Sequence, residues 1–381
     1  MAHTPAGCLF SPWTDPDEHP LIQFQNVTKN FGSFVAIDNL SLDIFEREFF
    51  ALLGPSGCGK TTMMRMLAGF EPLSSGTIRL AGEDLGSVPP NKRSINMMFQ
   101  SYALFPHLSV WENIAFGLRR EGIAKQPLTD RVEEMLRLTR LEKFARRKPH
   151  QISGGQRQRV ALARSLAKAP KLLLLDEPLG ALDKKLRQDT QFELMDIQEK
   201  TGTTFVIVTH DQEEAMTVAS RVAVMDEGRL VQVDTPDRIY EAPNSVYVAD
   251  FIGDVNIIQG RTNQQGDRVH ISWSEGQPPI IGTSSSNFGK DQSVHFAIRP
   301  EKISIWSDRP TASDDRANIV QGQIVDIAYL GNISTYHVKL PNGQMLKAQT
   351  ANTRRIARRK FTWDDTVWLS WSATGGILLE G

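Results

Sequence analysis

Cysteine is nearly absent from this chain, since Cys8 and Cys58 are the only two among 381 residues. So few thiols exclude a disulfide framework and a zinc site built on cysteine pairs, and they fit a reducing compartment. The sequence also lacks any run of about 18 apolar residues, the length that a membrane-spanning helix requires. No basic or apolar stretch precedes Cys8, which argues against a secretion signal there. We therefore expect a soluble, cytoplasmic protein.

An excess of either charge is absent as well. Lys and Arg number 43 and Asp and Glu 44, for a formal net charge of −1. This balance argues against a protein that coats nucleic acid or anionic lipid. The basic runs at 146–148 and 354–360 are therefore interpreted as solvated surface. His107 and His150 lack metal-ligand spacing and are interpreted as structural or surface residues.

Pattern and composition divide the chain into three parts. Residues 1–19 hold three prolines and no periodicity, and they are predicted to be a flexible N-terminal tail. Over 20–255, short apolar runs alternate with helix-like stretches, which predicts a largely parallel sheet flanked by helices. Over 256–381, short β-like runs follow one another, which predicts an all-β domain, a small barrel.

The predicted elements have the following limits. In the α/β domain, strands are expected at 21–27, 40–44, 49–53, 171–175, 204–208 and 221–225, and helices include 128–141 and 156–168. In the all-β domain, strands are expected at 294–298, 319–327, 334–340, 345–348 and 367–371, with a hairpin turn at 341–343.

A glycine-rich segment directly follows the apolar run 49–53. It fits the phosphate-loop pattern of Gly, four residues, Gly-Lys-Thr, in the strand-to-helix context that this pattern requires. Its glycines let backbone N–H groups surround phosphate oxygens, Lys60 would supply a charge to the outer phosphates, and Thr61 a hydroxyl to Mg²⁺. The alternative is an ordinary glycine-rich turn. The residues expected to bind nucleotide are Gly54, Pro55, Ser56, Gly57, Cys58, Gly59, Lys60, Thr61 and Thr62.

Two further motifs carry related chemistry. Asp176 and Glu177 end the apolar run 172–175, where Asp176 could hold Mg²⁺ and Glu177 could orient and deprotonate a water molecule. The alternative is a buried strand with a solvated acidic tip. A second segment opens a predicted helix and offers a second anion site, although its serine could simply cap that helix. That segment consists of Ser153, Gly154, Gly155 and Gln156.

In this order, the motifs resemble those of the ATP-binding subunits of ABC transporters. Gln100 resembles the Q-loop glutamine, Asp183 belongs to a segment similar to the D-loop, His210 resembles the switch histidine, and Phe31 stands where the family has an adenine-stacking aromatic. The resemblance covers residues 21–256. Ile152 replaces the more common Leu and conserves the volume of the side chain. Phe31 replaces the more common Tyr and conserves the aromatic face.

The resemblance implies an ABC ATPase domain, with a RecA-like core and a helical subdomain, that hydrolyses ATP with Mg²⁺. Two copies would sandwich two ATP molecules. The implied catalytic residues are Glu177, His210 and Gln100. The implied metal set is Thr61, Gln100 and Asp176. Each site would be completed by Ser153 and Gly155 of the other copy.

The β-rich part indicates which group of ABC transporter subunits the chain resembles. Residues 251–253 and 297–301 resemble importer subunits with an appended OB-like (TOBE) domain. Stretches at 95–105, 148–151, 179–187 and 327–338 are similar to the ATPase of the bacterial putrescine importer. This implies import of a polyamine, putrescine first; spermidine, a sugar and iron remain alternatives. Such subunits work at the cytoplasmic face of the bacterial inner membrane.

The implied partners are two transmembrane permease subunits, a second copy of the chain and, indirectly, a periplasmic solute-binding protein, with no nucleic acid. The apolar segment 101–107 could form a groove for a helix of a membrane partner, or it could be local core packing. A soluble ABC ATPase acting on ribosomes or DNA ends is the rival; one phosphate loop and no sustained heptads argue against it. A merely structural nucleotide binder would be expected to lack Glu177 or His210.

Overall fold

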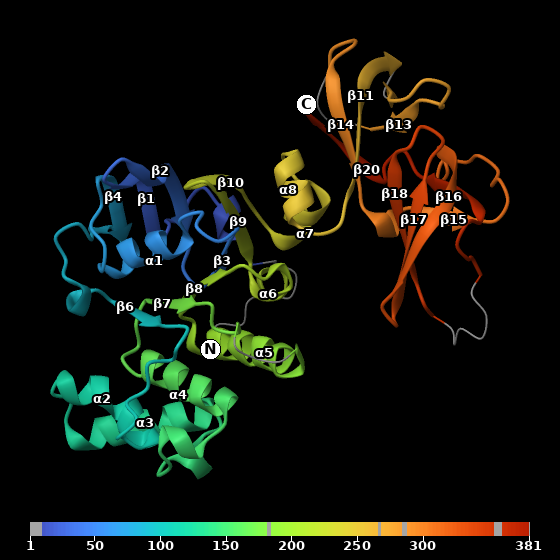
Figure 1. Ribbon diagram of the computed structural model, residues 1–381. Coiled ribbons are helices and arrows are strands. Elements are labelled where there is room, and N and C mark those ends of the chain that lie inside the picture. The colour runs from blue at the N-terminus through green and yellow to red at the C-terminus, as the bar shows by residue number, and fades with distance from the viewer. Residues whose placement is uncertain (1–9, 181–183, 266–267, 284–287, 354–359, 381) are drawn as a thin grey trace. The chain divides into compact units, whose positions relative to one another are not determined.

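The computed structural model describes residues 10–180, 184–265, 268–283, 288–353 and 360–380 (Figure 1). The chain forms two compact units, an N-terminal unit of residues 1–239 and a C-terminal unit of residues 240–381. Each unit is treated on its own below. Among the described residues, no helix is both long enough and apolar enough to span a membrane.

The division falls earlier than the boundary expected at 255/256. The reason lies in helix α8 (Val246–Phe251), which belongs to the C-terminal unit. The Arg299 guanidinium, which is 4% exposed, donates hydrogen bonds to the carbonyls of Ala249, Gly253 and Asp254. These bonds link the helix to the β-rich part, and the helical pattern of the sequence did not reveal them.

The centre of the N-terminal unit is a six-stranded sheet with the order β10-β9-β3-β8-β7-β6. Its strands pair in parallel, except that β10 pairs antiparallel with β9. β3, β7 and β8 are almost wholly buried, as expected for apolar runs covered on both faces. The largely parallel sheet is thus confirmed. Its strands are β3 (Phe49–Leu53), β6 (Ile95–Met98), β7 (Leu172–Asp176), β8 (Thr204–Thr209), β9 (Arg221–Asp226) and β10 (Arg229–Asp234).

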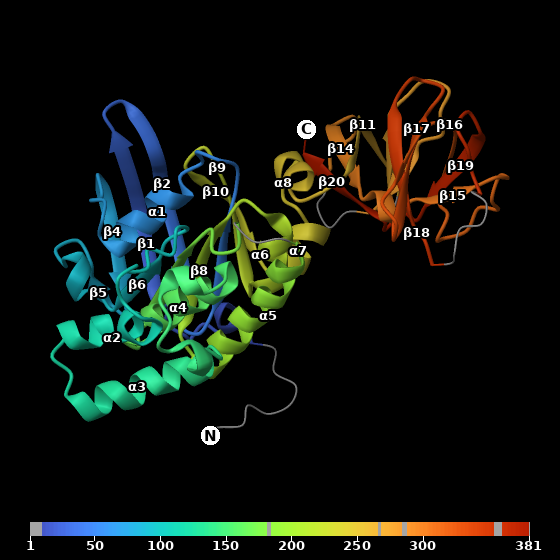
Figure 2. The ribbon, with the colours of Figure 1, turned by 60° about the horizontal axis from the view of Figure 1, so that its bottom comes forward.

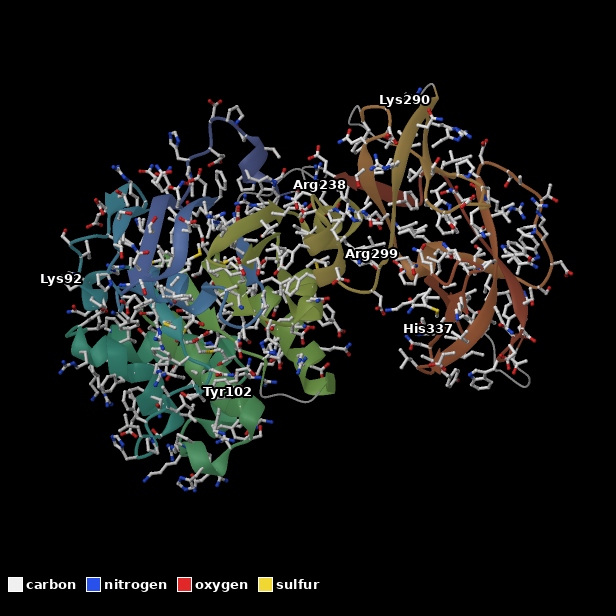
Figure 3. All side chains as sticks on the ribbon, turned by 45° about the horizontal axis from the view of Figure 1, so that its top comes forward. Lys92, Tyr102, Arg238, Lys290, Arg299 and His337 are labelled. Carbon is white, nitrogen blue, oxygen red and sulfur yellow. The ribbon has the colours of Figure 1, made fainter. Side chains whose placement is uncertain are left out.

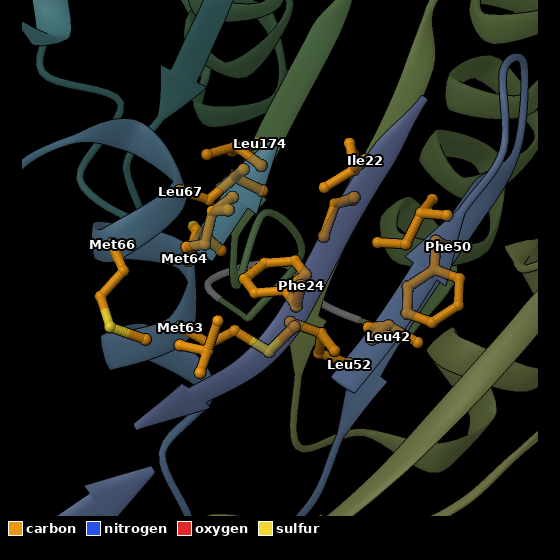
Figure 4. Close-up of a cluster of buried hydrophobic side chains, with 14 of the residues drawn as sticks. Ile22, Phe24, Leu42, Phe50, Leu52, Met63, Met64, Met66, Leu67 and Leu174 are labelled. Atoms are coloured by element: carbon orange, nitrogen blue, oxygen red, sulfur yellow. The ribbon is translucent and has the colours of Figure 1, made fainter. Parts of the chain in front are cut away.

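A second, antiparallel sheet with the order β2-β1-β4-β5 completes the unit. The two strands expected at 21–27 and 40–44 form its long hairpin. Figure 4 shows buried side chains of this sheet, of the central sheet and of α1 in one hydrophobic cluster, with Phe24, Phe50 and Met63 among them. The strands are β1 (Ile22–Phe31), β2 (Phe34–Ile44), β4 (Ser75–Leu80) and β5 (Glu83–Asp84).

Helices cover the central sheet in two groups. α4 packs against α2, α3 and strand β6, whereas α1 packs against β2, β6, β7 and β8 (Figures 1 and 2). The helix predicted at 128–141 is α3 and the helix predicted at 156–168 is α4. The helices are α1 (Lys60–Ala68), α2 (Val110–Arg120), α3 (Lys125–Leu138), α4 (Gly154–Leu166), α5 (Lys184–Thr201), α6 (Gln212–Val218) and, at the division between the units, α7 (Pro236–Glu241).

The N-terminal tail differs from expectation over residues 10–19. A short 3₁₀ helix spans Pro12–Thr14. The guanidinium of Arg221 lies 4.9 Å from the ring centre of Trp13, a cation–π contact with the body of the unit. The composition of the tail concealed this contact because its partner lies about two hundred residues away in the sequence. This part of the predicted flexible tail therefore packs against the unit.

The C-terminal unit consists of two five-stranded antiparallel sheets with the orders β13-β12-β11-β14-β20 and β15-β19-β16-β17-β18. One hydrophobic core takes side chains from both sheets, which confirms the all-β domain. Gly343, at φ 88°, lies in the expected hairpin turn between β17 and β18. The strands are β11 (Asn256–Gln265), β12 (Arg268–Ser272), β13 (Ile280–Gly282), β14 (Ser293–Ile298), β15 (Ser304–Trp306), β16 (Asn318–Tyr329), β17 (Ile333–Lys339), β18 (Met345–Ala351), β19 (Thr366–Trp371) and β20 (Gly376–Glu380).

Candidate functional site

One edge of the central sheet collects most of the predicted site. Strands β3, β8, β7 and β6 are parallel neighbours, so their carboxyl ends meet at the same edge. The glycine-rich loop 54–61 follows β3, His210 follows β8, Glu177 follows β7, and Gln100 lies two residues beyond β6. In open α/β sheets, ligands bind outside the carboxyl ends of the strands. The topology therefore places these groups where such a sheet binds its ligand.

The glycine-rich loop has the backbone geometry that its pattern predicts. Gly57 and Gly59 have φ values of 85° and 105°, in the left-handed region that favours glycine. A Cβ on Gly59 would lie 2.7 Å from the carbonyl oxygen of Ala36 and 2.6 Å from Cδ1 of Ile37. A side chain at position 59 would therefore displace neighbouring backbone, and the loop keeps the conformation in which its N–H groups can surround an anion.

Lys60 is the first residue of helix α1 and lies largely inside the loop. Its side chain is 6% exposed, and its ammonium donates hydrogen bonds to the carbonyls of Gly54 and Pro55 at 2.7 and 2.8 Å. The same nitrogen lies 3.6 Å from Sγ of the buried Cys58. A compact cation held at the N-terminus of a helix is suited to phosphate oxygens.

Glu177 is held between two other predicted site residues. Nε2 of Gln100 donates to its Oε2 at 2.9 Å, and Nδ1 of His210 lies 3.0 Å from its Oε1. Glu177 also has a φ of 45°, a sparsely populated conformation for a residue other than glycine. A carboxylate fixed from both sides at this edge can orient and deprotonate a water molecule.

Asp176 supplies the second carboxylate, at the end of β7. Burial and the negative charge of Glu177 raise the pKa of Asp176, while the charge of Arg65 opposes that rise. A cation near these two carboxylates would relieve their repulsion. The described residues contain no group of three or more His, Cys, Asp or Glu side chains arranged to hold a metal. By their chemistry, the carboxylate of Asp176, the hydroxyl of Thr61 and the amide oxygen of Gln100 are donors that suit Mg²⁺ sharing phosphate oxygens.

Phe31 lies at the tip of the β1–β2 hairpin. It pairs with Phe34 across the turn, and its side chain is 47% exposed. The ammonium of Lys29 lies 4.7 Å from the ring centre. An exposed ring at the end of a hairpin can stack on a flat ligand; the structure shows no contact between Phe31 and the loop 54–61 among its described interactions.

Ser153 and the phosphate loop lead into different helices. Ser153 caps α4, whose packing partners are α2, α3 and β6, while the loop leads into α1. The hydroxyl of Ser153 accepts from the N–H of Gln156, and Oε1 of Gln156 accepts from the N–H of Ser153. This capping box accounts for both residues within the helix. Asp183 lies outside the described residues.

The segment 101–107 is tied to the helices on both sides. Arg164 of α4 donates to the carbonyls of Tyr102 and Ala103, and Asn113 of α2 bonds to both backbone groups of Phe105 (Figure 3 labels Tyr102). Phe105 packs on Phe116 with ring centres 4.4 Å apart. Local packing therefore explains part of the apolar character of this segment.

Sequence reasoning missed the polar residues behind His210. Thr209 and Glu214 are both buried and bonded to each other, and Asp211 caps α6 by accepting from the N–H of Glu214. The Asp-x-x-Glu spacing before a helix is a capping signal that could have indicated Asp211. Nothing in the sequence reveals that the Glu214 carboxyl is buried.

Comparison with known proteins gives consistent results for both units. Residues 37–180 match the ABC transporter family, and residues 296–379 match the TOBE domain family. The chain is 51% identical to the putrescine transport ATP-binding protein PotG of Escherichia coli over 94% of this chain and 95% of that protein. It is 47% identical to the spermidine/putrescine import ATP-binding protein PotA of Rubrobacter xylanophilus, over 94% of each.

Solved structures agree over the N-terminal part. A post-hydrolysis dimer of the ATP-binding cassette MJ0796 with ADP and Pi is 31% identical, with a TM-score of 0.50, and covers 56% of this chain and 98% of that one. The cbiO1 subunit of an ABC transporter from Clostridium perfringens is 28% identical, with a TM-score of 0.55 over 58% of this chain and 91% of that one. The expected ABC ATPase domain followed by a TOBE domain is thus confirmed, and the chain belongs to the ATP-binding subunits of ABC transporters.

Proposed function

We propose that this chain hydrolyses ATP at the carboxyl edge of its central sheet to power import of a polyamine, putrescine first. The observation that carries the site is the Glu177 carboxylate, bonded by Gln100 and close to His210 at the edge where the phosphate loop begins. A phosphate-binding loop beside a fixed carboxylate is the arrangement that phosphoryl transfer to water requires.

The side chains would divide the work as follows. Lys60 and the loop N–H groups hold the phosphates, and Glu177 takes a proton from the attacking water. His210 and Gln100 keep the Glu177 carboxylate in place, since both contact its oxygens. When bound, Mg²⁺ supplies charge neutralisation at the phosphate oxygens; Thr61, Gln100 and Asp176 would hold it. Phe31 would stack on the base.

Two copies of the chain would form each complete site. Ser153 starts α4, whose main packing partners within one chain are α2, α3 and β6, so a partner's α4 could supply a second helix N-terminus. Ser153, Gly154, Gly155 and Gln156 of one copy, with Asp183, would then face the nucleotide of the other. The similar cassette described as a dimer with ADP and Pi supports this arrangement.

The cargo is inferred from the relatives. The relatives reported above are ATP-binding subunits of putrescine and spermidine/putrescine transport, and the similarity spans both units. Putrescine ranks first because the 51% identical relative is the putrescine subunit; spermidine, and then another solute such as a sugar or iron, are the alternatives. The ATPase subunit itself would not contact the cargo.

The proposed partners are two permease subunits, with a periplasmic solute-binding protein acting through them, at the cytoplasmic face of a bacterial inner membrane. The segment 101–107 supports a docking role, because Gln100 immediately precedes it and contacts Glu177. A permease helix that displaces this segment would therefore also move Gln100. No role in nucleic-acid binding is proposed.

Co-purification tests the whole assembly. The chain would be tagged in its native cell, membranes solubilised gently, and bound proteins identified by mass spectrometry, with the untagged strain as control. We expect two multi-spanning proteins and a solute-binding protein that binds putrescine when purified. Ribosomal or DNA-associated partners without any membrane protein would contradict the transport function and leave only the ATPase site.

A further inference from the structure

The position of the His210 side chain is set by the backbone that carries it and not by packing around its ring. Its side chain is 59% exposed, and Glu177 is its hydrogen-bonding partner at 3.0 Å. An exposed ring with such a contact moves whenever the turn beneath it moves. The turn between β8 and α6 must therefore be fixed by other groups if Nδ1 is to stay beside the carboxylate.

Those groups are the side chains of the residues on either side of His210 and of Glu214 in α6. Thr209, which is 1% exposed, donates its hydroxyl hydrogen to Oε2 of Glu214, and the same hydroxyl accepts from the N–H of Asp211 at 3.0 Å. The N–H of Glu214 in turn donates to Oδ1 of Asp211 at 3.1 Å. The residues on both sides of His210 are thus bonded to one another and to Glu214.

A further contact links this turn to α5. The guanidinium of Arg187 pairs with Oδ2 of Asp211. Arg187 lies in the first turn of α5, shortly after residues 181–183. Asp211 therefore uses one oxygen to cap α6 and the other to bind a helix that begins beside the predicted D-loop.

Glu214 is unusual as a buried acid. It is 2% exposed, and its Oε1 has no hydrogen-bond partner within the described part of the chain. Burial raises the pKa of Glu214 to about 7; the Thr209 bond and the charges of Arg187 and His210 oppose that rise, and the charge of Asp211 adds to it. The elements packed on α6 are α5, β3 and β8; the two strands carry no titratable side chains, and Arg187 is the α5 residue whose charge acts on Glu214. Near neutral pH, the carboxyl is therefore partly protonated.

We propose that Glu214 is a positioning residue for His210: through Thr209 and Asp211 it fixes the turn that holds the imidazole against Glu177, and the Arg187–Asp211 ion pair connects that turn to α5. This inference rests on the proposed roles of Glu177 and His210 in hydrolysis.

The test uses the full-length chain and steady-state ATP hydrolysis. Glu214→Ala removes the carboxyl, whereas Glu214→Gln keeps an acceptor for the Thr209 hydroxyl and cannot ionise. We expect Glu214→Ala to lower kcat by about 10- to 100-fold, the range for a reacting group displaced by about 1 Å, with little change in KM for ATP. We expect Glu214→Gln to restore most of the activity, because its side-chain oxygen still accepts from the Thr209 hydroxyl.

Controls separate positioning from folding. Glu213→Ala alters an exposed acid on the same helix and should keep wild-type kcat. Thr209→Val keeps the shape of a β-branched residue and removes the hydroxyl, and Thr209→Ser keeps the hydroxyl; we expect only the first to lose kcat. If Glu214→Ala fails to fold, this second pair decides the question. Wild-type kcat in Thr209→Val, or an equal loss in both Thr209 variants, would overturn the proposal.

Glu177→Gln, measured in parallel, separates this inference from the proposed function. Normal turnover in Glu177→Gln would contradict the proposed active site itself. Loss of turnover in Glu177→Gln together with wild-type kcat in Glu214→Ala and Thr209→Val would leave the active site standing and overturn only the role of Glu214.

Discussion

The functional edge of the N-terminal unit and the interior of the C-terminal unit use polar side chains differently. In the N-terminal unit, parallel strands end at one edge, and Gln100 and His210 each contact the carboxylate of Glu177 there. In the C-terminal unit, whose strands are antiparallel, buried polar side chains bond to the backbone of neighbouring segments. Asn318 bonds to both backbone groups of Ile281, and Arg299 to three carbonyls around α8. Two side chains that meet at one carboxylate indicate chemistry, whereas the backbone bonds of Asn318 and Arg299 indicate structural support.

Of the changes that test this difference between the units, Lys60→Ala should have the largest effect. Because Lys60 supplies the buried cation of the phosphate loop, the change should abolish ATP binding or turnover, measured with a fluorescent ATP analogue and by phosphate release. Lys92→Ala, at an exposed lysine labelled in Figure 3, is the control and should behave as wild type. ATP turnover that survives in Lys60→Ala would place the nucleotide elsewhere.

Glu177→Gln should have the next largest effect. Loss of the general base should slow hydrolysis by about 10²–10⁴-fold, while the nucleotide still binds and a nucleotide-bound dimer accumulates. Turnover is measured by phosphate release and dimerisation by analytical ultracentrifugation, with the exposed Glu83→Gln as the matched control. An unchanged rate would assign the base to another residue.

These expectations show what the sequence could and could not reveal. The phosphate loop and the apolar run 49–53 are local patterns, and the structure has a strand with the predicted limits there. The antiparallel sheet β2-β1-β4-β5 depends on pairing between β1 and β4, far apart in the chain, and was not predicted. The contact of Trp13 with Arg221 and the burial of Glu214 likewise depend on distant partners. Motifs made of neighbouring residues can be recognised in the sequence. Contacts between residues far apart in the chain cannot.

Arg299→Met probes the structural use of polar groups in the C-terminal unit. It leaves buried carbonyls of Ala249 and its neighbours without a donor, so the unit should lose about 2–3 kcal/mol of unfolding free energy. Five of the seven tryptophans lie in residues 240–381, so tryptophan fluorescence in urea mainly follows this unit. Basal ATP hydrolysis should stay near wild type.

Arg268→Met is the control for that experiment, since Arg268 pairs with Asp314 at an exposed position and should change stability by less than about 0.5 kcal/mol. A large fall in ATP hydrolysis by folded Arg299→Met would show that the C-terminal unit takes part in the chemistry. The comparison between the units would then need to be revised.

The smallest effect is expected from Gly343→Ala. Gly343 has φ 88° with open space at its Cβ, so alanine should cost only about 1–2 kcal/mol in the C-terminal unit and leave ATP binding intact. The same change at Gly59, where the Cβ would meet the carbonyl oxygen of Ala36, should abolish ATP binding. Urea unfolding and analogue binding measure both variants; equal effects on ATP binding would contradict the distinction.

Putrescine uptake tests the central claim most directly. Cells that lack the gene for this chain would be complemented with the wild-type chain or with Glu177→Gln, at equal amounts in the membrane fraction, and given radiolabelled putrescine. The account predicts that the wild-type chain restores energy-dependent uptake and that Glu177→Gln does not. Two results would contradict it: equal uptake with the wild-type chain and with Glu177→Gln, or the same uptake in cells that carry neither chain.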